Sequence, residues 1–419
     1  MLRSASSPVS RVLLLVLPLV LITPGDATGA SETTSGQPAP VSVAPERPKE
    51  SSSGLPAYDC DIENGLYATI TACSLDEPKL QEETKVKLRV ADFKKDLEVR
   101  VLWQGEASPL VALVLGLATR SKDKMAQLWK HNLYQAGFSV MTFDSVFLPA
   151  FSERSRHGVA ANLAVEARVV GKVVDAFLKL PEARNRVTKL GVVGISYGGT
   201  LALELAKLAA EGQVPIRPER VLAFSPPIRM KTAAGLLDKF YREDRWNYTM
   251  MDLASDILGH KPVPKGEPIP FTDSEMRAGI ALAFRMDLKE VLEYGDRVYK
   301  LGLLPKRGLY DDEYRRDVAG TWTFTRFVEE AAFAYWAKHG NGSSLEDLWA
   351  AGDVIRLLPE CPSTVRVILC QDDPLNDPAE LEQLREVADP ARLTVLPRGG
   401  HMGYNRTEWL KARLKKLFD

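Results

Sequence analysis

Short apolar runs alternate with longer segments in which apolar residues recur every three or four positions. Runs at 84–90 and 97–103 alternate apolar and polar residues, which predicts strands with one buried face, whereas the continuously apolar run at 110–116 predicts a strand buried on both faces. Further strands are predicted at 139–144, 189–195, 220–225, 365–369 and 392–396. Helices are predicted at 123–136, 159–180 and 200–210, and from residue 407 onward. This alternation predicts an α/β fold with a mainly parallel sheet and helices on both faces.

The alternation stops between Pro227 and Pro362, where the chain is helical in pattern and rich in aromatic residues. This stretch is too long to be a loop. We therefore expect a helical cap insertion at 228–362, between two late strands of the sheet. The two parts of one α/β core, at 57–227 and 363–419, flank it.

The first residues of the chain show a different pattern. Arg3 and Arg11 precede an apolar run at 12–22, and small residues follow it. This order is typical of a cleaved secretory signal peptide, and the run is far shorter than the ~20 residues of a spanning helix. We predict a signal peptide at 1–30 and a secreted or periplasmic protein. Residues 31–56 are rich in Ser, Thr, Pro and Glu and predict a disordered linker.

Net charge and cysteine content exclude two further classes of protein. The chain has 54 Lys and Arg against 55 Asp and Glu, so a net charge of −1 gives no electrostatic basis for nucleic-acid binding. Four cysteines are too few for a disulfide scaffold, so a hydrophobic core must hold the fold. In an oxidising compartment Cys60 can pair with Cys73. Cys361 and Cys370 stand at opposite ends of an extended strand, too far apart to pair, and should be buried singly.

The strongest chemical signal is the sequence Gly194-Ile195-Ser196-Tyr197-Gly198, between a predicted strand and a predicted helix. A chain that turns sharply from strand to helix there presents Ser196 at its apex, and glycines at 194 and 198 remove the Cβ atoms that would collide. The start of the helix then directs backbone N–H groups toward a developing negative charge. The alternative is an ordinary strand–helix turn without chemistry.

This segment resembles the nucleophile elbow of the α/β-hydrolase superfamily, in which an acid and a histidine follow the nucleophile on later loops. The resemblance implies that Asp373, just after the strand at 365–369, is the acid, with Asp372 as the alternative. It also implies that His401, in the Gly-Gly-His-x-Gly loop after the strand at 392–396, is the catalytic histidine. The competing interpretations are solvated loop carboxylates and a structural histidine.

Acid–base chemistry gives each group a role. Ser196 is a weak nucleophile until His401 takes its proton, and Asp373 orients the imidazole and stabilises its positive charge. The resemblance further implies an oxyanion hole formed by the backbone N–H groups of Tyr197 and Leu117. The histidine that commonly precedes the second donor in this family is replaced here by leucine.

The resemblance extends over residues 85–419 and implies hydrolysis of an ester, thioester or amide without a metal or organic cofactor. We expect an exported serine hydrolase that cleaves a carboxylic ester of a small or lipid-like acyl substrate, with no nucleic-acid partner and no stable membrane span. An acyltransferase or peptidase with the same triad, and a catalytically silent binding protein, are the alternatives. Oligomeric state and acyl-chain length stay open. The aromatic residues of the insertion can line an acyl or alkyl pocket or form the insertion's own core. They are Trp322, Phe324, Phe327, Phe333, Tyr335 and Trp336.

Overall fold

The computed structural model describes residues 54–72, 82–243, 263, 266–306, 312–340 and 344–419. The predicted signal peptide at 1–30 lies outside these residues, as does the predicted linker except for its last three positions. None of the helices in the described part of the chain is long and apolar enough to span a bilayer.

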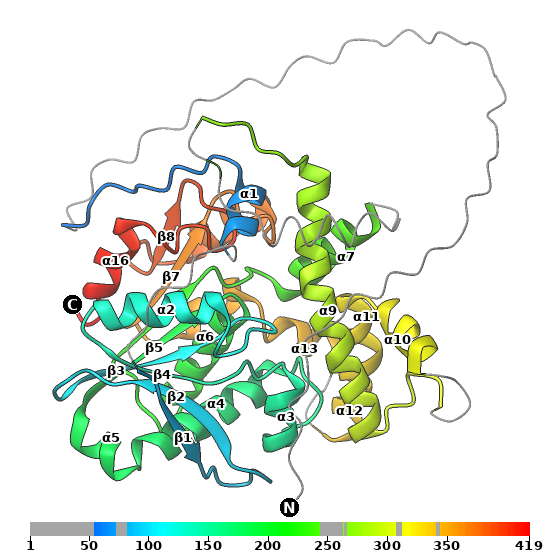
Figure 1. Ribbon diagram of the computed structural model, residues 1–419, viewed down its shortest axis with the longest axis horizontal. Helices are drawn as coiled ribbons and strands as arrows, with labels where there is room; N and C mark the ends of the chain where they lie inside the picture. The colour runs from blue at the N-terminus through cyan, green and yellow to red at the C-terminus, as the bar shows by residue number, and fades with distance from the viewer. Residues whose placement is uncertain (1–53, 73–81, 244–262, 264–265, 307–311, 341–343) are drawn as a thin grey trace, which may run out of the picture. The chain divides into compact units, whose positions relative to one another are not determined.

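An eight-stranded, mostly parallel sheet forms the centre of the described residues (Figure 1). Its strands are β1 (Thr84–Leu88), β2 (Leu97–Leu102), β3 (Ser108–Val114), β4 (Ser139–Thr142), β5 (Val187–Ile195), β6 (Arg220–Phe224), β7 (Val365–Cys370) and β8 (Leu393–Leu396). They lie in the order β1-β2-β4-β3-β5-β6-β7-β8. The pairs β1–β2 and β2–β4 are antiparallel, and all later pairs are parallel. The predicted fold class is therefore confirmed.

Helices cover both faces of the sheet, as the buried strands require. They are α1 (Gly65–Thr71), α2 (Lys124–Gln135), α3 (Pro149–Ser155), α4 (Leu163–Leu178), α5 (Pro181–Arg186), α6 (Tyr197–Ala210), α15 (Pro378–Val387) and α16 (Glu408–Lys415). Alternate residues of β3 point to opposite sides: Leu110 and Ala112 pack in the core that contains α4 and α6, and Val111 and Leu113 pack in the core that contains α2 and α16. A strand buried on both sides is what the apolar run at 110–116 predicts.

Between β6 and β7 the described residues are helical (Figure 1). The elements are α7 (Met230–Glu243), α9 (Asp273–Tyr299), α10 (Asp312–Gly320), α11 (Phe324–Arg326), the π-helical turn η1 (Phe327–Ala332), α12 (Phe333–Lys338), α13 (Leu345–Ala350) and α14 (Val354–Glu360). The long helix α9 packs against α7 and α10. Asp238 of α7 accepts hydrogen bonds from the N–H groups of Phe324 (2.8 Å) and Thr325 (3.0 Å), which joins α7 to the start of α11.

The cysteines can be compared with expectation only in part. Cys60 is a free, buried thiol, and Cys73, its expected partner, lies outside the described residues. The backbone at Cys60 is tied to the histidine loop, because its carbonyl oxygen accepts a hydrogen bond from Arg398 Nε at 2.6 Å. Cys361 and Cys370 are free and buried, as the length of the intervening strand predicts.

Candidate active site

Ser196 lies at the junction between β5 and α6, in a turn that only glycine neighbours allow. Its backbone has a positive φ, with φ +54° and ψ −126°, a conformation that costs ~1–3 kcal/mol for a residue with a side chain. A Cβ atom at Gly194 would lie 2.1 Å from the carbonyl oxygen of Gly198, and one at Gly198 would lie 2.2 Å from that of Val114. The N–H of Ser196 donates to the carbonyl of Phe224 at 2.8 Å, which fixes the turn to the neighbouring strand.

A continuous chain of hydrogen bonds leads away from the serine hydroxyl. His401 Nε2 lies 2.8 Å from Ser196 Oγ, and His401 Nδ1 lies 2.9 Å from Asp373 Oδ2. Because a carboxylate only accepts hydrogen bonds, Nδ1 carries the proton, and Nε2 has a free lone pair that accepts from the hydroxyl. Asp373 and His401 are 4% and 5% exposed. The arrangement can therefore remove the serine proton with a base and an acid that are themselves buried.

The two neighbouring aspartates lie in different environments. Asp373 Oδ1 accepts from the N–H of Leu375 at 2.9 Å, which leaves Oδ2 for the imidazole. Asp372 instead accepts from the N–H groups of Gly399 (3.1 Å) and Gly400 (2.8 Å). Burial raises the pKa of Asp372, and these two N–H groups oppose that rise. The structure thus brings Asp373 to His401 and uses Asp372 to hold the loop that carries it.

The two predicted oxyanion donors both border Ser196. Strand order reverses at β3 and β5, which is where open α/β sheets bind ligands. The loop after β3 approaches the turn so closely that a Cβ at Gly116 would lie 3.1 Å from Ser196 Cβ, and the next residue, Leu117, lines the same cavity as Ser196. Tyr197 is the first residue of α6, and the first N–H groups of a helix have no acceptor within it.

Helix α1 supports the histidine loop, a role that the sequence did not reveal. Thr69 Oγ1 accepts from the backbone N–H of His401 at 2.8 Å and donates to the carbonyl of Gly65 at 2.7 Å. Farther along the same loop, Asn405 Nδ2 donates to the carbonyl of Ala72 at 3.1 Å. An Asn ahead of an apolar segment is a helix-start signal and could have predicted α1, but nothing local signals its contact with a loop more than 300 residues later.

A buried carboxyl group next to the Ser196 turn is a second feature that the sequence did not reveal. Glu166 of α4 is 0% exposed; its Oε2 accepts from the hydroxyl of Tyr197 at 2.5 Å, and its Oε1 accepts from the N–H of Ala161 at 2.8 Å. Burial raises the pKa of Glu166 to about 7, and hydrogen bonds from Tyr197, Ala161 and Asn162 limit the rise. Burial and the Glu166 carboxylate together raise the pKa of Tyr197. In sequence, Glu166 is indistinguishable from a favourable acidic residue in the first turn of a helix.

Two cavities meet at Ser196. One, of about 550 Å³, is lined by Ser196 and His401, and the other, of about 60 Å³, is lined by Ser196 and Tyr197. Of the six aromatic residues predicted either to line a pocket or to form the insertion's own core, Phe324 and Phe327 line the smaller cavity. Trp336 of α12 is instead buried against the α/β core, where its Nε1 donates to the carbonyl of Val159 at 3.0 Å. The pocket-lining interpretation therefore holds for Phe324 and Phe327, and Trp336 fits neither interpretation, because it packs against the α/β core.

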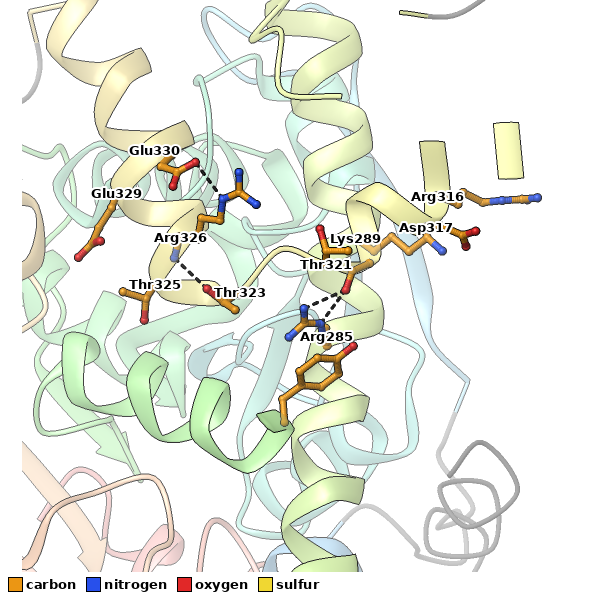
Figure 2. A pocket seen from close by; sticks show the side chains of 12 residues that line it. Arg285, Lys289, Arg316, Asp317, Thr321, Thr323, Thr325, Arg326, Glu329 and Glu330 are labelled. Carbon is orange, nitrogen blue, oxygen red and sulfur yellow. Dashed lines mark hydrogen bonds and ion pairs between the residues drawn. The ribbon is translucent and has the colours of Figure 1, made fainter. Parts of the chain in front are cut away.

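A larger cavity, of about 810 Å³, lies among α7, α9, α10 and η1 and contains none of the predicted catalytic residues (Figure 2). Two of its arginines make contacts within the cavity wall. The Arg285 guanidinium donates to the carbonyl of Gly320 and lies over the ring of Tyr241, and Arg326 Nε donates to Glu330 at 2.9 Å. In the described part of the chain, no group of three or more His, Cys, Asp or Glu side chains is arranged to hold a metal ion.

Known proteins resemble this chain in sequence and in structure. Residues 116–411 match the sequence model of a family described as the alpha/beta hydrolase family. An esterase from Pyrococcus furiosus is similar in structure over 80% of this chain and 90% of its own, at 13% identity and a TM-score of 0.45. An esterase from Pyrobaculum calidifontis is similar over 84% of this chain and 87% of its own, at 14% identity and a TM-score of 0.40. A carboxyl esterase from Tuber melanosporum is similar over 82% of this chain and 89% of its own, at 13% identity and a TM-score of 0.42. No curated protein matches the sequence.

Proposed function

Since the chain belongs to the alpha/beta hydrolase family, we propose that it is a serine hydrolase that cleaves carboxylic esters through an acyl-enzyme. The observation that carries this proposal is the unbroken hydrogen-bonded chain from Ser196 through His401 to Asp373. Each member has the chemistry that acyl transfer requires: a hydroxyl, a base within reach of it and a carboxylate that orients the base.

In the first half of the reaction, Ser196 Oγ attacks the carbonyl carbon of the ester as His401 Nε2 takes the hydroxyl proton. The electron pair of the carbonyl double bond moves to its oxygen, and the N–H groups of Leu117 and Tyr197 bind the resulting oxyanion. Asp373 stabilises the imidazolium without taking its proton. As the carbon–oxygen bond to the alcohol breaks, Nε2 gives the proton to the departing oxygen, and the acyl group stays on Ser196.

The second half repeats these steps with water as the nucleophile. His401 Nε2 removes a proton from water while the water oxygen attacks the acyl carbon, and the same two N–H groups bind the second oxyanion. When the bond to Ser196 breaks, the imidazolium returns its proton to Oγ. The products are a carboxylic acid and the restored hydroxyl. Burial of His401 and Asp373 supports this cycle, because a low local dielectric strengthens the interaction between the carboxylate and the imidazolium.

Export is a second part of the proposal. It is supported by the basic residues, the short apolar run and the small residues within 1–30. Expression of the full-length chain in a secreting host, followed by N-terminal sequencing of the protein outside the cytoplasm, tests it. A new N-terminus near residue 30 is expected, and retention of the intact chain in the cytoplasm would count against export.

Hydrolysis of p-nitrophenyl butyrate by purified protein tests the proposed chemistry. We expect Ser196→Ala and His401→Ala each to lower kcat by at least about a thousandfold. Ser363→Ala, which alters an exposed serine, is the matched control and should leave kcat unchanged. Undiminished activity in Ser196→Ala would contradict the assignment of the nucleophile. A folded wild-type protein inactive on esters, thioesters and amides alike would favour a binding scaffold.

A further inference from the structure

The two cavities at Ser196 differ about ninefold in size, with volumes of about 550 and 60 Å³. Resting on the proposed function, we infer that this hydrolase is selective for esters of short aliphatic acids with bulky alcohols. The acyl chain occupies the small cavity and the alcohol occupies the large one. Three observations lead to this substrate class: the position of the histidine, the capacity of the small cavity and the way its wall is fixed.

The position of His401 decides which part of the ester enters which cavity. The imidazole must protonate the departing alcohol oxygen, so the alcohol has to lie on the side where Nε2 is reachable. His401 lines the large cavity together with Ser196, whereas the residues that line the small cavity include Ser196 and Tyr197 but not His401. Phe284 and Leu117 border both cavities and lie between them. The alcohol therefore takes the large cavity, and the acyl chain is left with the small one.

The small cavity is almost entirely apolar. Its walls come from the α/β core and from the insertion, with Phe147 and Tyr197 on one side and Leu237, Phe327 and Val328 on the other. Its volume of about 60 Å³ is far below the range of about 300–1,000 Å³ in which proteins enclose whole small molecules. The small cavity therefore suits a short acyl chain better than a long one.

The walls are tied in place. The ring of Phe147 lies edge-on to Tyr197, at 5.9 Å between centroids, and to Phe327, at 6.0 Å. Tyr197 cannot swing outward without giving up its hydrogen bond to Glu166, which would leave two buried polar groups without partners. Glu166 also holds Ala161, a second wall residue, whose φ is +81°. Phe327 and Val328 begin the π-helical turn η1, so their positions depend on a non-α-helical backbone.

The large cavity suits a bulky alcohol. Its volume of about 550 Å³ is within the range of about 300–1,000 Å³ in which proteins enclose whole small molecules. Apolar side chains of Ile70, Met125 and Ile280 line it, and Lys122 and Asp287 add charged groups of both signs. An alcohol with a ring or branched skeleton is therefore accommodated, whereas the acyl side admits only a short chain.

The test is the dependence of kcat/KM on acyl length, measured with p-nitrophenyl acetate, butyrate, octanoate and laurate. For wild type we expect the highest values with acetate or butyrate and a fall of at least about tenfold at octanoate. Leu237→Ala, which widens the small cavity, should raise the octanoate-to-butyrate ratio by at least about tenfold. Leu237→Val makes a milder change at the same wall, with a smaller shift in the same direction.

The matched control is Ile280→Ala, which widens the large cavity. It should leave the octanoate-to-butyrate ratio unchanged and alter the preference between p-nitrophenyl and 1-naphthyl butyrate. A wild-type preference for octanoate or laurate would overturn the inference and leave the proposed function standing. A ratio that shifts with Ile280→Ala but not with Leu237→Ala would mean that the two sides are reversed. Loss of activity on esters of every length would instead remove the proposed function itself.

Discussion

Replacing Glu166 by Gln is expected to flatten part of the pH dependence of stability. The carboxyl of Glu166 is fully buried between the hydroxyl of Tyr197 and the N–H of Ala161. Gln has nearly the same shape and no charge. Its Oε1 can accept from Ala161, and its Nε2 can donate to the Tyr197 oxygen once the hydroxyl turns its proton away. The variant therefore keeps the contacts and removes the titration.

The magnitude follows from the pKa of Glu166. Burial raises that pKa from an ordinary value of 4.5 to about 7, which corresponds to about 3 kcal/mol at 1.36 kcal/mol for each pH unit. The native state therefore keeps this proton to higher pH than the unfolded state does. The cost is absent well below pH 4.5, where both states are protonated, grows as pH rises, and is complete above about pH 7. Wild type thus loses about 3 kcal/mol of unfolding free energy to this group over that window, and the Gln variant does not.

The assay is urea unfolding followed by tryptophan fluorescence, at several pH values between about 4 and 8. The quantity compared is the unfolding free energy of Glu166→Gln minus that of wild type, which should increase by about 3 kcal/mol across this window. Glu386→Gln, which changes an exposed carboxylate, is the control and should give a difference that varies little with pH. A difference for Glu166→Gln that is also constant with pH would refute the reasoning about this buried carboxyl.

Three further outcomes are expected. Asp373→Asn should lower kcat for p-nitrophenyl butyrate by at least about a hundredfold because an amide cannot stabilise the imidazolium, and Asp372→Asn should cost only about tenfold; the reverse ranking would exchange the two roles. In urea unfolding, Gly198→Ala should lose about 3 kcal/mol or more, since the added Cβ would lie 2.2 Å from a carbonyl oxygen of β3, and near-native stability would contradict this geometry. Thr69→Val should leave the N–H of His401 without its acceptor, lower kcat and lower the free energy of unfolding by about 1–3 kcal/mol. Thr69→Ser keeps a hydroxyl and should retain both values. Equal behaviour of the two variants would show that the Thr69 hydroxyl does not support the histidine loop.

Local patterns were sufficient to predict the sheet. The eight predicted strands all occur, with ends shifted by a few residues, because alternating and continuously apolar runs report directly on which faces are buried. The turn at Ser196 was predictable for a similar reason. A Cβ at Gly194 would collide with Gly198 itself, so this requirement lies within five consecutive residues, whereas the collision at Gly198 is with Val114 of the neighbouring strand. The resemblance to the α/β-hydrolase superfamily then pointed to Asp373 and His401, which the structure brings into one hydrogen-bonded chain with Ser196.

Contacts between distant segments could not be predicted in this way. Thr69 and Glu166 were unremarked because each looks ordinary among its neighbours, and their importance comes from partners far along the chain or from burial. The hydrogen bond from Arg398 to the carbonyl of Cys60 is a further contact of this kind, because it joins segments more than 300 residues apart. In the insertion, periodicity marks aromatic residues as buried but cannot say whether the neighbour is a cavity, as for Phe327, or the core, as for Trp336.

The central claim is that the hydroxyl of Ser196 is a nucleophile activated by His401, and covalent labelling tests it most directly. The purified protein is treated with a fluorophosphonate probe, and the modified peptide is identified by mass spectrometry. The account predicts a single adduct on Ser196, no adduct in Ser196→Ala, and slower labelling in His401→Ala. Labelling that persists in Ser196→Ala, or that is found on another residue of the wild-type protein, would contradict it.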